Sequence, residues 1–185
     1  MGALAHLDQA VERILAWDEE TLERLSNSRF LRFLHLPLLI ATYVGYGYLW
    51  AALALALIVF GTEVDHQNVL IGVGVTASVV LFCQGVKALT HRPRPTFVRQ
   101  GFHHQFLTSS SFPSNHTAMA FAMAYLILRL YPAWYNILLL YLLAVLIGLS
   151  RVYLREHYPL DVLGGAALGT YLAHGLFPWL AQCAR

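Results

Sequence analysis

Charged residues are scarce in this sequence. Asp, Glu, Lys and Arg make up 12% of its 185 residues, whereas 58% are hydrophobic. Soluble domains carry roughly 25% charged residues, so the composition excludes an ordinary soluble domain and indicates an integral membrane protein. The formal net charge of +2 is too small to indicate a nucleic-acid partner.

Cysteine is also scarce, and the polar loops lack a dense group of carboxylates. Cys83 and Cys183 lie in or beside apolar runs, and we interpret both as small packing residues rather than as a disulfide or metal pair. Because Mg²⁺ and Ca²⁺ need several carboxylate ligands, we expect no metal and no cofactor. Residues 1–34 contain many acidic residues and no apolar core, so we do not expect them to be a signal peptide.

Apolar runs recur through the rest of the chain. A helix needs about 20 residues to cross a bilayer. The runs that reach or approach this length are 36–60, 68–86, 116–131, 134–150 and 160–180. We therefore predict an all-α, polytopic membrane helix bundle with about five transmembrane helices. Residues 36–180 would form the transmembrane core of a single domain, 1–185. In the last run, Gly165 and Gly169 are spaced as in closely packed membrane helices.

The segment before the first apolar run has a different pattern. Between residues 3 and 32, leucine, isoleucine and valine recur at helical spacing, with acidic residues and arginines between them. This pattern predicts an amphipathic helix that lies along the membrane interface, within an interfacial segment 1–34. A loosely ordered tail is the alternative.

Basic residues are concentrated on one predicted membrane face. With five spans, the loops at 87–115 and 150–159 share a face with the N-terminal segment, and this face carries ten of the 12 lysines and arginines. The short loops at 61–67 and 132–133 lie on the other face. Basic loops alone can simply mark the cytoplasmic side. That explanation does not account for the prolines, histidines and hydroxyl groups among these cations.

The first of three polar motifs begins where an apolar run ends. Lys87 is followed seven residues later by Arg94, in a segment that Pro93 and Pro95 stiffen. An ammonium and a guanidinium that converge suit a phosphate group. We interpret Arg92, which has a different spacing, as a surface or phosphate-rim residue. The loop histidines that we interpret as surface or interface residues are His91, His103 and His104.

The second motif is Pro113-Ser114-Asn115-His116, at the start of an apolar run. Ser114 is a favourable N-cap residue, and the N–H groups and dipole of a helix N-terminus attract anions. His116 would then lie in the first turn, beside any bound anion. An ordinary capped helix with an interfacial histidine is the alternative.

The third motif runs from Ser150-Arg151 to His157 and Asp161. A carboxylate four residues after a histidine can hold one ring nitrogen and leave the other free to act as a base or nucleophile. A structural His–Asp contact and a metal pair are the alternatives for this motif alone. All three motifs are predicted at the same membrane face, which favours phosphoryl chemistry through a histidine without a metal.

These residues resemble the type 2 phosphatidic acid phosphatase superfamily, whose signature is K-x6-RP, PSGH and SR-x5-H-x3-D. The three parts appear here at 87–95, 113–116 and 150–161, with Asn115 in place of the usual glycine. The span pattern extends the resemblance to about 68–180. The resemblance implies a lipid phosphatase in which His157 attacks phosphorus, Asp161 orients it and His116 protonates the leaving oxygen. The implied phosphate-binding residues are Lys87, Arg94, Ser114, Asn115 and Arg151.

The resemblance also implies the substrate and the compartment. Small size and five spans resemble bacterial undecaprenyl-diphosphate phosphatases, so we expect a lipid phosphate substrate, most simply undecaprenyl diphosphate converted to the monophosphate. Alternatives are a phosphatidylglycerophosphate or lipid A 1-phosphate phosphatase, a lipid phosphotransferase, or a non-catalytic lipid-binding relative. We expect a protein of the bacterial cytoplasmic (inner) membrane with its active site on the extracytoplasmic face, although the count of basic residues points to the other side.

Overall fold

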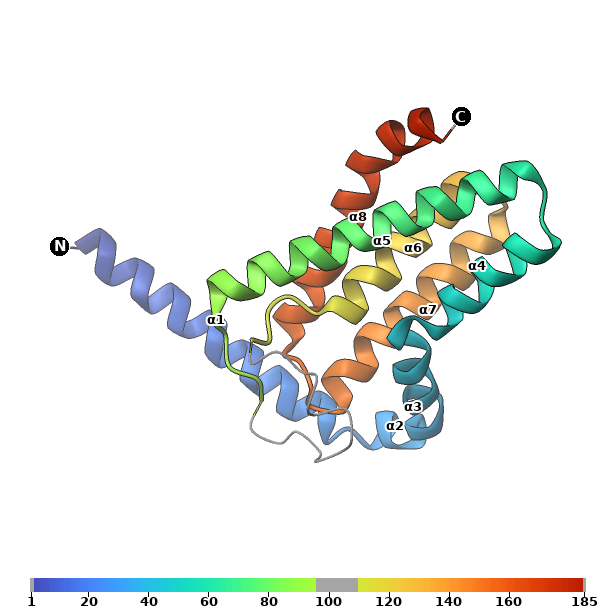
Figure 1. Ribbon diagram of the computed structural model, residues 1–185. Coiled ribbons are helices and arrows are strands. Elements are labelled where there is room, and N and C mark those ends of the chain that lie inside the picture. The colour runs from blue at the N-terminus through green and yellow to red at the C-terminus, as the bar shows by residue number, and fades with distance from the viewer. Residues whose placement is uncertain (1, 96–109, 185) are drawn as a thin grey trace.

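The computed structural model describes residues 2–95 and 110–184, and within these ranges all regular secondary structure is helical. The expectation of an all-α protein is therefore confirmed (Figure 1). His103 and His104 lie outside the described residues. The elements are α1 (Gly2–Ser26), α2 (Arg29–Phe33), α3 (His35–Tyr43), the π-helical turn η1 (Val44–Tyr48), α4 (Leu49–Phe60), α5 (Glu63–Thr90), α6 (Asn115–Leu130), α7 (Trp134–Tyr153) and α8 (Pro159–Cys183).

Three of the five expected membrane spans are long and apolar enough to cross a bilayer. They are the continuous segment His35–Phe60, α5 and α7. The other two expected spans, α6 and α8, do not meet the same criteria of length and composition. Helix α6 has only 16 residues, and the glycines and polar residues of α8 lower its hydropathy.

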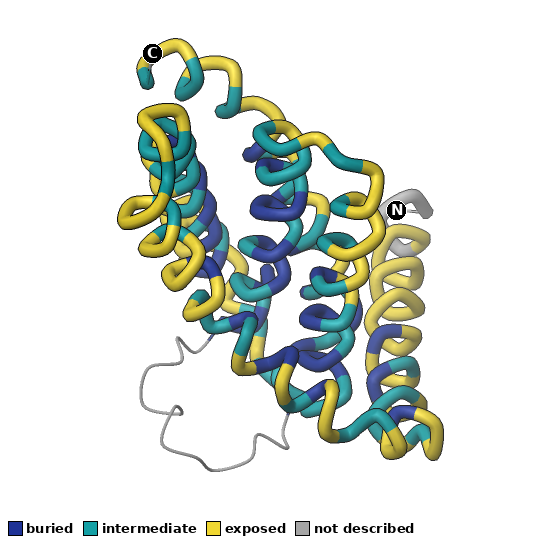
Figure 2. The backbone as a smooth tube through the Cα atoms, turned by 90° about the vertical axis from the view of Figure 1, so that its right-hand side faces the viewer, coloured by how far each residue is buried: buried dark blue, intermediate teal, exposed yellow. Residues whose placement is uncertain are grey.

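The composition of α6 reflects its position in the centre of the bundle, because small side chains let neighbouring helices approach on several sides. Ala118 and Ala122 are buried in a cluster with residues of α5 and α8. Ala120 and Ala124, on another face, are buried in a cluster with residues of α3 and α7. Figure 2 shows that buried residues gather in the interior of the bundle, whereas exposed residues predominate on the outer helices.

Helices α6 and α8 cross in close contact at the two glycines that the sequence singled out. A Cβ atom on Gly165 would lie 2.6 Å from the carbonyl oxygen of Ser114. A Cβ on Gly169 would overlap the carbonyl oxygen of Ala118. The expected small-residue packing face is therefore present, and it fixes the N-terminus of α6 against the N-terminal half of α8.

The expected N-terminal helix is present as α1, which overturns the alternative of a loosely ordered tail for its described residues. It extends away from the bundle toward its N-terminus (Figure 1), and the side chains of Leu7, Val11 and Ile14 are more than half exposed. Near its other end, Asp18 and Leu22 are buried. Helix α1 is thus attached to the bundle through its C-terminal half, and its place at a membrane interface stays a prediction.

The loops separate into two ends of the bundle, as the five-span topology predicts. At one end, Tyr131 donates a hydrogen bond of 2.6 Å to Asp65, which joins the α6–α7 connection to the start of α5. The other end contains residues 91–95, 110–114 and 154–158, where the three polar motifs meet (Figure 1).

Candidate active site

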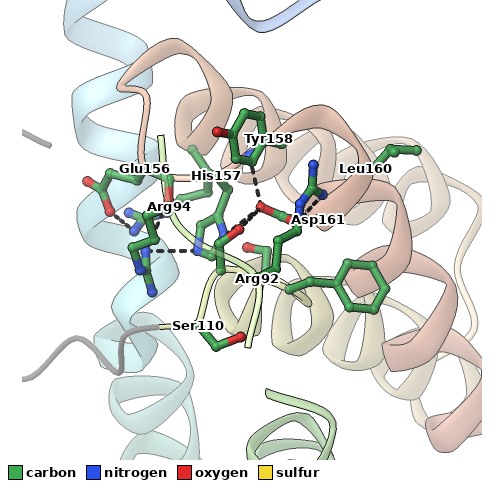
Figure 3. Close-up of polar contacts among 12 residues, drawn as sticks. Arg92, Arg94, Ser110, Glu156, His157, Tyr158, Leu160 and Asp161 are labelled. Carbon is green, nitrogen blue, oxygen red and sulfur yellow. Dashed lines mark hydrogen bonds and ion pairs between the residues drawn. The ribbon is translucent and has the colours of Figure 1, made fainter. Parts of the chain in front are cut away.

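The three polar motifs converge at one end of the bundle. From the first motif, Arg94 Nη1 lies 3.0 Å from the carbonyl oxygen of Glu156 and 3.4 Å from Nε2 of His157 in the third (Figure 3). From the second motif, the backbone N–H of Ser114 donates to the carbonyl oxygen of Asp161, at 3.0 Å. Segments that lie more than 60 residues apart in sequence therefore share one small volume.

His157 lies between a carboxylate and a guanidinium. Its side chain is 2% exposed, and its Nδ1 lies 3.5 Å from Oδ2 of Asp161. The same Oδ2 accepts hydrogen bonds from the Ser111 hydroxyl (2.5 Å) and from the backbone N–H of Tyr158 (2.9 Å). The His157–Asp161 contact has the length of an ion pair rather than of a direct hydrogen bond, and such contacts often tighten only when substrate is bound. Since Nδ1 faces the carboxylate, Nε2 is the nitrogen left for chemistry.

The surroundings of His157 keep its imidazole neutral. Burial lowers the pKa of His157 to about 3, Asp161 acts in the opposite direction, and the guanidinium groups of Arg151 and Arg94 add to the lowering. An unperturbed histidine titrates near pH 6.5. At neutral pH the ring therefore retains the lone pair that a nucleophile requires.

Arg151 is a fully buried cation, and not all of its N–H groups are hydrogen-bonded within the described residues. One of its nitrogens, Nη2, is bonded to the Glu156 carboxylate. Its Nε and Nη1 have no hydrogen-bond partner among the described residues. Buried donors are nearly always satisfied, and a planar guanidinium suits a phosphate. These two N–H groups of Arg151 are therefore placed to donate to an anion, next to the Tyr46 ring.

His116 and Arg151 lie against the same aromatic ring. The His116 and Tyr46 ring centroids are 4.7 Å apart in an edge-on arrangement, and the Arg151 guanidinium carbon lies 5.7 Å from the Tyr46 ring. Tyr46 comes from η1, where Gly47 has a φ of +95° that glycine adopts without strain. The sequence analysis missed Tyr46, and the only signal for it is the pair of glycines that flanks it in an apolar run.

The second motif begins α6 as expected, although the serine side chain does not cap the helix. Ser114 occupies the N-cap position, but its hydroxyl accepts from Thr117 at 3.0 Å instead of binding a backbone N–H. Asn115 is the first residue of the helix, and its buried Oδ1 has no hydrogen-bond partner among the described residues. The N-terminus of α6 thus begins without a side-chain cap.

Lys87 lies in the last turn of α5 and borders the site. It is 4% exposed, and its Nζ donates to the carbonyl oxygens of Ser110 (3.0 Å) and Ser111 (3.4 Å). These two carbonyls belong to the segment that leads into the second motif. The contact therefore ties the first motif to the second and keeps an ammonium group beside the other cations.

The interpretation of Arg92 as a surface residue is wrong, and its alternative, a phosphate-rim residue, stays a prediction. Its side chain is only 18% exposed, and it bonds Asp18 of α1 at 2.5 Å and Asp161 at 2.8 Å. Its guanidinium also lies over the Tyr158 ring, at 4.4 Å. The partner in α1 lies 74 residues earlier, so no local pattern could reveal it. By contrast, His91 is exposed at the C-cap of α5, as expected of a surface residue.

An apolar groove of about 700 Å³ leads away from the site. It begins at Tyr46 and Met119 and follows α6 to Tyr131, at the other end of the bundle. Helices α4 and α5 form its other walls, with Trp50 and Gly72 among the lining residues. Tyr131, the C-cap of α6, follows Met119 by 12 positions, so the groove is about 18 Å long. Its apolar lining suits a hydrocarbon chain.

Among the described residues, no group of three or more His, Cys, Asp or Glu could hold a metal ion. The candidate spans and the buried cations beside His157 describe a membrane protein with a cluster of positive groups around one histidine. The chain belongs to the PAP2 superfamily, which matches residues 68–185. This match confirms the resemblance to the type 2 phosphatidic acid phosphatases that the motifs indicate.

Comparisons with individual proteins agree with the family. The chain is 36% identical over 121 residues to YbjG of Escherichia coli, and this match covers 63% of this chain and 59% of that protein. It is 31% identical over 133 residues to the undecaprenyl-diphosphatase BcrC of Bacillus subtilis, and this match covers 69% of this chain and 66% of that protein. The chain thus spans about three fifths to two thirds of the length of these two relatives.

The fold also has a counterpart among solved structures. The transmembrane PAP2-type phosphatidylglycerolphosphate phosphatase of Bacillus subtilis superposes with a TM-score of 0.70, over 90% of this chain and 86% of that one. The two sequences are 23% identical. At this identity the likeness concerns the fold, and it places the helices of this chain in a known membrane architecture.

Proposed function

We propose that this protein is a metal-independent lipid phosphatase that works through a phosphohistidine on His157. The observation that carries the proposal is the buried, neutral His157, with Nδ1 toward Asp161 and Nε2 toward Arg94. The two unsatisfied donors of Arg151 support a phosphoryl group as the occupant of this space. Membership of the PAP2 superfamily supports the same chemistry.

In the proposed reaction, Nε2 of His157 attacks phosphorus and forms an N–P bond. The bond from phosphorus to the lipid or phosphate oxygen breaks, and His116 gives that oxygen a proton. Water then attacks the phosphohistidine and loses a proton to His116, which releases inorganic phosphate and frees Nε2. Preorganised positive groups stabilise charge that develops in such transition states. The cations proposed for this role are Lys87, Arg94 and Arg151, and Ser114 and Asn115 are proposed as further, neutral phosphate-binding residues.

We propose undecaprenyl diphosphate as the preferred substrate, because the relative BcrC is an undecaprenyl-diphosphatase and the groove suits a long hydrocarbon chain. Phosphatidylglycerophosphate and a lipid A 1-phosphate are the alternatives. Phosphate release from each lipid by the purified protein in detergent, with and without EDTA, distinguishes them. We expect undecaprenyl diphosphate to be cleaved fastest and EDTA to have no effect. Release that needs added metal would contradict the mechanism, and release from none of these lipids would favour a binding role.

The groove gives a second prediction, which concerns the lipid chain. A side chain at Gly72 points into the groove, because its Cβ would make an ordinary 3.8 Å contact with Leu126. We expect Gly72→Phe to raise KM about tenfold for a long-chain lipid phosphate, a loss of about 1.4 kcal/mol, and to leave KM for a short-chain phosphate ester unchanged.

The matched control for this prediction is Gly85→Phe on the same helix, where a Cβ meets nothing within 4 Å. Gly85 does not line the groove, so we expect this variant to keep the wild-type KM for both substrates. Equal KM changes for long and short substrates in Gly72→Phe would show that the groove does not hold the chain.

We further propose that all five expected segments cross a bacterial cytoplasmic membrane, with the active site on the extracytoplasmic face. The PAP2 family supports this placement against the excess of basic residues near the site. Cys183 is exposed and belongs to the end of the bundle opposite the site, whereas Cys83 is buried. We expect Cys183 to resist membrane-impermeant thiol reagents in intact cells. Labelling there that Cys183→Ser abolishes would reverse the orientation.

A further inference from the structure

Asp18, a buried residue of α1, is linked to the candidate catalytic residue Asp161 through a single intervening residue, Arg92. Asp18 is fully buried, and both its oxygens are engaged. Its Oδ1 accepts from the backbone N–H of Leu160, at 2.8 Å, in the first turn of α8. Its Oδ2 accepts from Nη2 of Arg92, at 2.5 Å. A buried charge is costly unless it is paired, so Asp18 is placed here by specific contacts rather than by chance.

The same guanidinium reaches the aspartate that faces His157. Nη1 of Arg92 bonds Oδ1 of Asp161 at 2.8 Å, which leaves Oδ2 of Asp161 toward the histidine. The contacts therefore form a continuous series from Asp18 through Arg92 and Asp161 to His157. Figure 3 shows Arg92 beside Asp161, with Tyr158 and Leu160 on the adjoining part of the chain.

We propose that Asp18 and Arg92 are positioning residues that hold the Asp161 carboxylate in the orientation His157 needs. Because Asp18 holds Nη2 of the guanidinium, Nη1 is kept pointing toward Oδ1 of Asp161. Helix α1 thereby completes the active site, in addition to any role at the membrane. The proposal rests on the proposed function of His157, and it assigns Asp18 and Arg92 no contact with substrate.

A second contact between α1 and the same region provides the control. Glu23 bonds Arg155 with both carboxylate oxygens, at 2.6 and 2.8 Å, in an exposed position. Glu23 has no contact with Asp161 among those that the structure shows. If α1 were needed only as an attached helix, loss of the Glu23 contact and loss of the Asp18 contact would affect the enzyme in the same way.

The test compares Asp18→Asn with Glu23→Gln in the full-length protein. An asparagine keeps an oxygen for the Leu160 N–H but presents an NH₂ group, instead of an acceptor, to Arg92. Small displacements of catalytic groups can cost about 100-fold in rate. We expect Asp18→Asn to lower kcat about 10- to 100-fold, with KM within about threefold of wild type, because Lys87, Arg94 and Arg151 are untouched. We expect Glu23→Gln to keep kcat within about twofold.

A double variant tests whether Asp18 acts through Arg92. Since residues that act as one unit are non-additive, Asp18→Asn/Arg92→Gln should lower kcat no further than Arg92→Gln alone. Rates are divided by the amount of folded protein, measured by thermal unfolding in detergent. A loss of activity that only follows the folded fraction, a wild-type kcat in Asp18→Asn, or multiplicative losses in the double variant would overturn the proposal.

His157→Ala separates this inference from the proposed function in the same assay. If His157→Ala is inactive and Asp18→Asn has the wild-type kcat, the positioning role fails and the proposed function stands. If His157→Ala is as active as wild type, the proposed function fails, and the positioning role fails with it.

Discussion

His157→Ala should lower kcat by at least about 10⁴-fold, because removal of a catalytic nucleophile typically costs this much or more. His157 is the buried imidazole whose Nδ1 faces a carboxylate and whose Nε2 faces the cations of the site. Its neutral state requires no proton loss before attack. The measurement is phosphate release by wild type and variant in detergent. Quenching of wild type in alkaline detergent during turnover of ³²P-labelled lipid should also trap an acid-labile, base-stable phosphoprotein that the variant lacks.

His174→Ala is the control for this prediction. His174 also belongs to α8, but its ring bonds Tyr125 at 2.8 Å, more than 10 residues along the helix from the site. We expect this variant to retain activity within about twofold and to give the same trapped phosphoprotein as wild type. A trapped phosphoprotein in His157→Ala would place the covalent step on another residue and would contradict the mechanism.

Gly169→Ala should destabilise the bundle by about 3 kcal/mol or more, the upper part of the range for overpacked cores. The added Cβ would overlap a backbone carbonyl oxygen, that of Ala118, which cannot move aside as the tip of a side chain can. Separation of α6 from α8 would also displace Ser114, whose backbone N–H is bonded to Asp161. We therefore expect a lower unfolding temperature in detergent and loss of activity in the same variant.

Gly175→Ala on the same helix is the matched control, because a Cβ there meets nothing within 4 Å. Alanine is favoured over glycine in a helix by about 0.5–1 kcal/mol. We expect this variant to be as stable as wild type or slightly more stable. If Gly169→Ala were equally stable, the close contact of α6 and α8 would not be what holds the two helices together.

The sequence was sufficient to predict the motif residues that meet at the candidate site, because their spacing within each motif is fixed by short stretches of chain. Lys87, Arg94, His157 and Asp161 were predicted in this way, and the structure brings them to one end of the bundle. Their catalytic roles stay proposals. The helical class was also predictable, since apolar runs of these lengths in a membrane protein favour helices.

Contacts between distant segments could not be predicted. Asp18 resembles the other acids of an amphipathic helix, and Arg92 resembles a neighbour of Arg94 in a basic loop. Only the fold shows that they are bonded to each other. Helix α6 also departs from a typical span, because it has only 16 residues and is enclosed by other helices, where small residues allow close packing.

The bend at Gly47 divides the first span into two halves with separate neighbours. Below it, α3 is tied to α7 through the Thr42–Ser150 hydrogen bond of 2.8 Å, next to Arg151. Above it, α4 contributes Trp50 and Leu57 to the groove and none of the phosphate-site residues. We therefore expect α4 to influence which lipid chain is accepted, whereas Tyr46 of η1 borders both the groove and the cluster of cations. We expect substitutions in α4 to change which lipid is accepted with little effect on how its phosphate is removed, so that substrate range would evolve independently of the chemistry in this bundle.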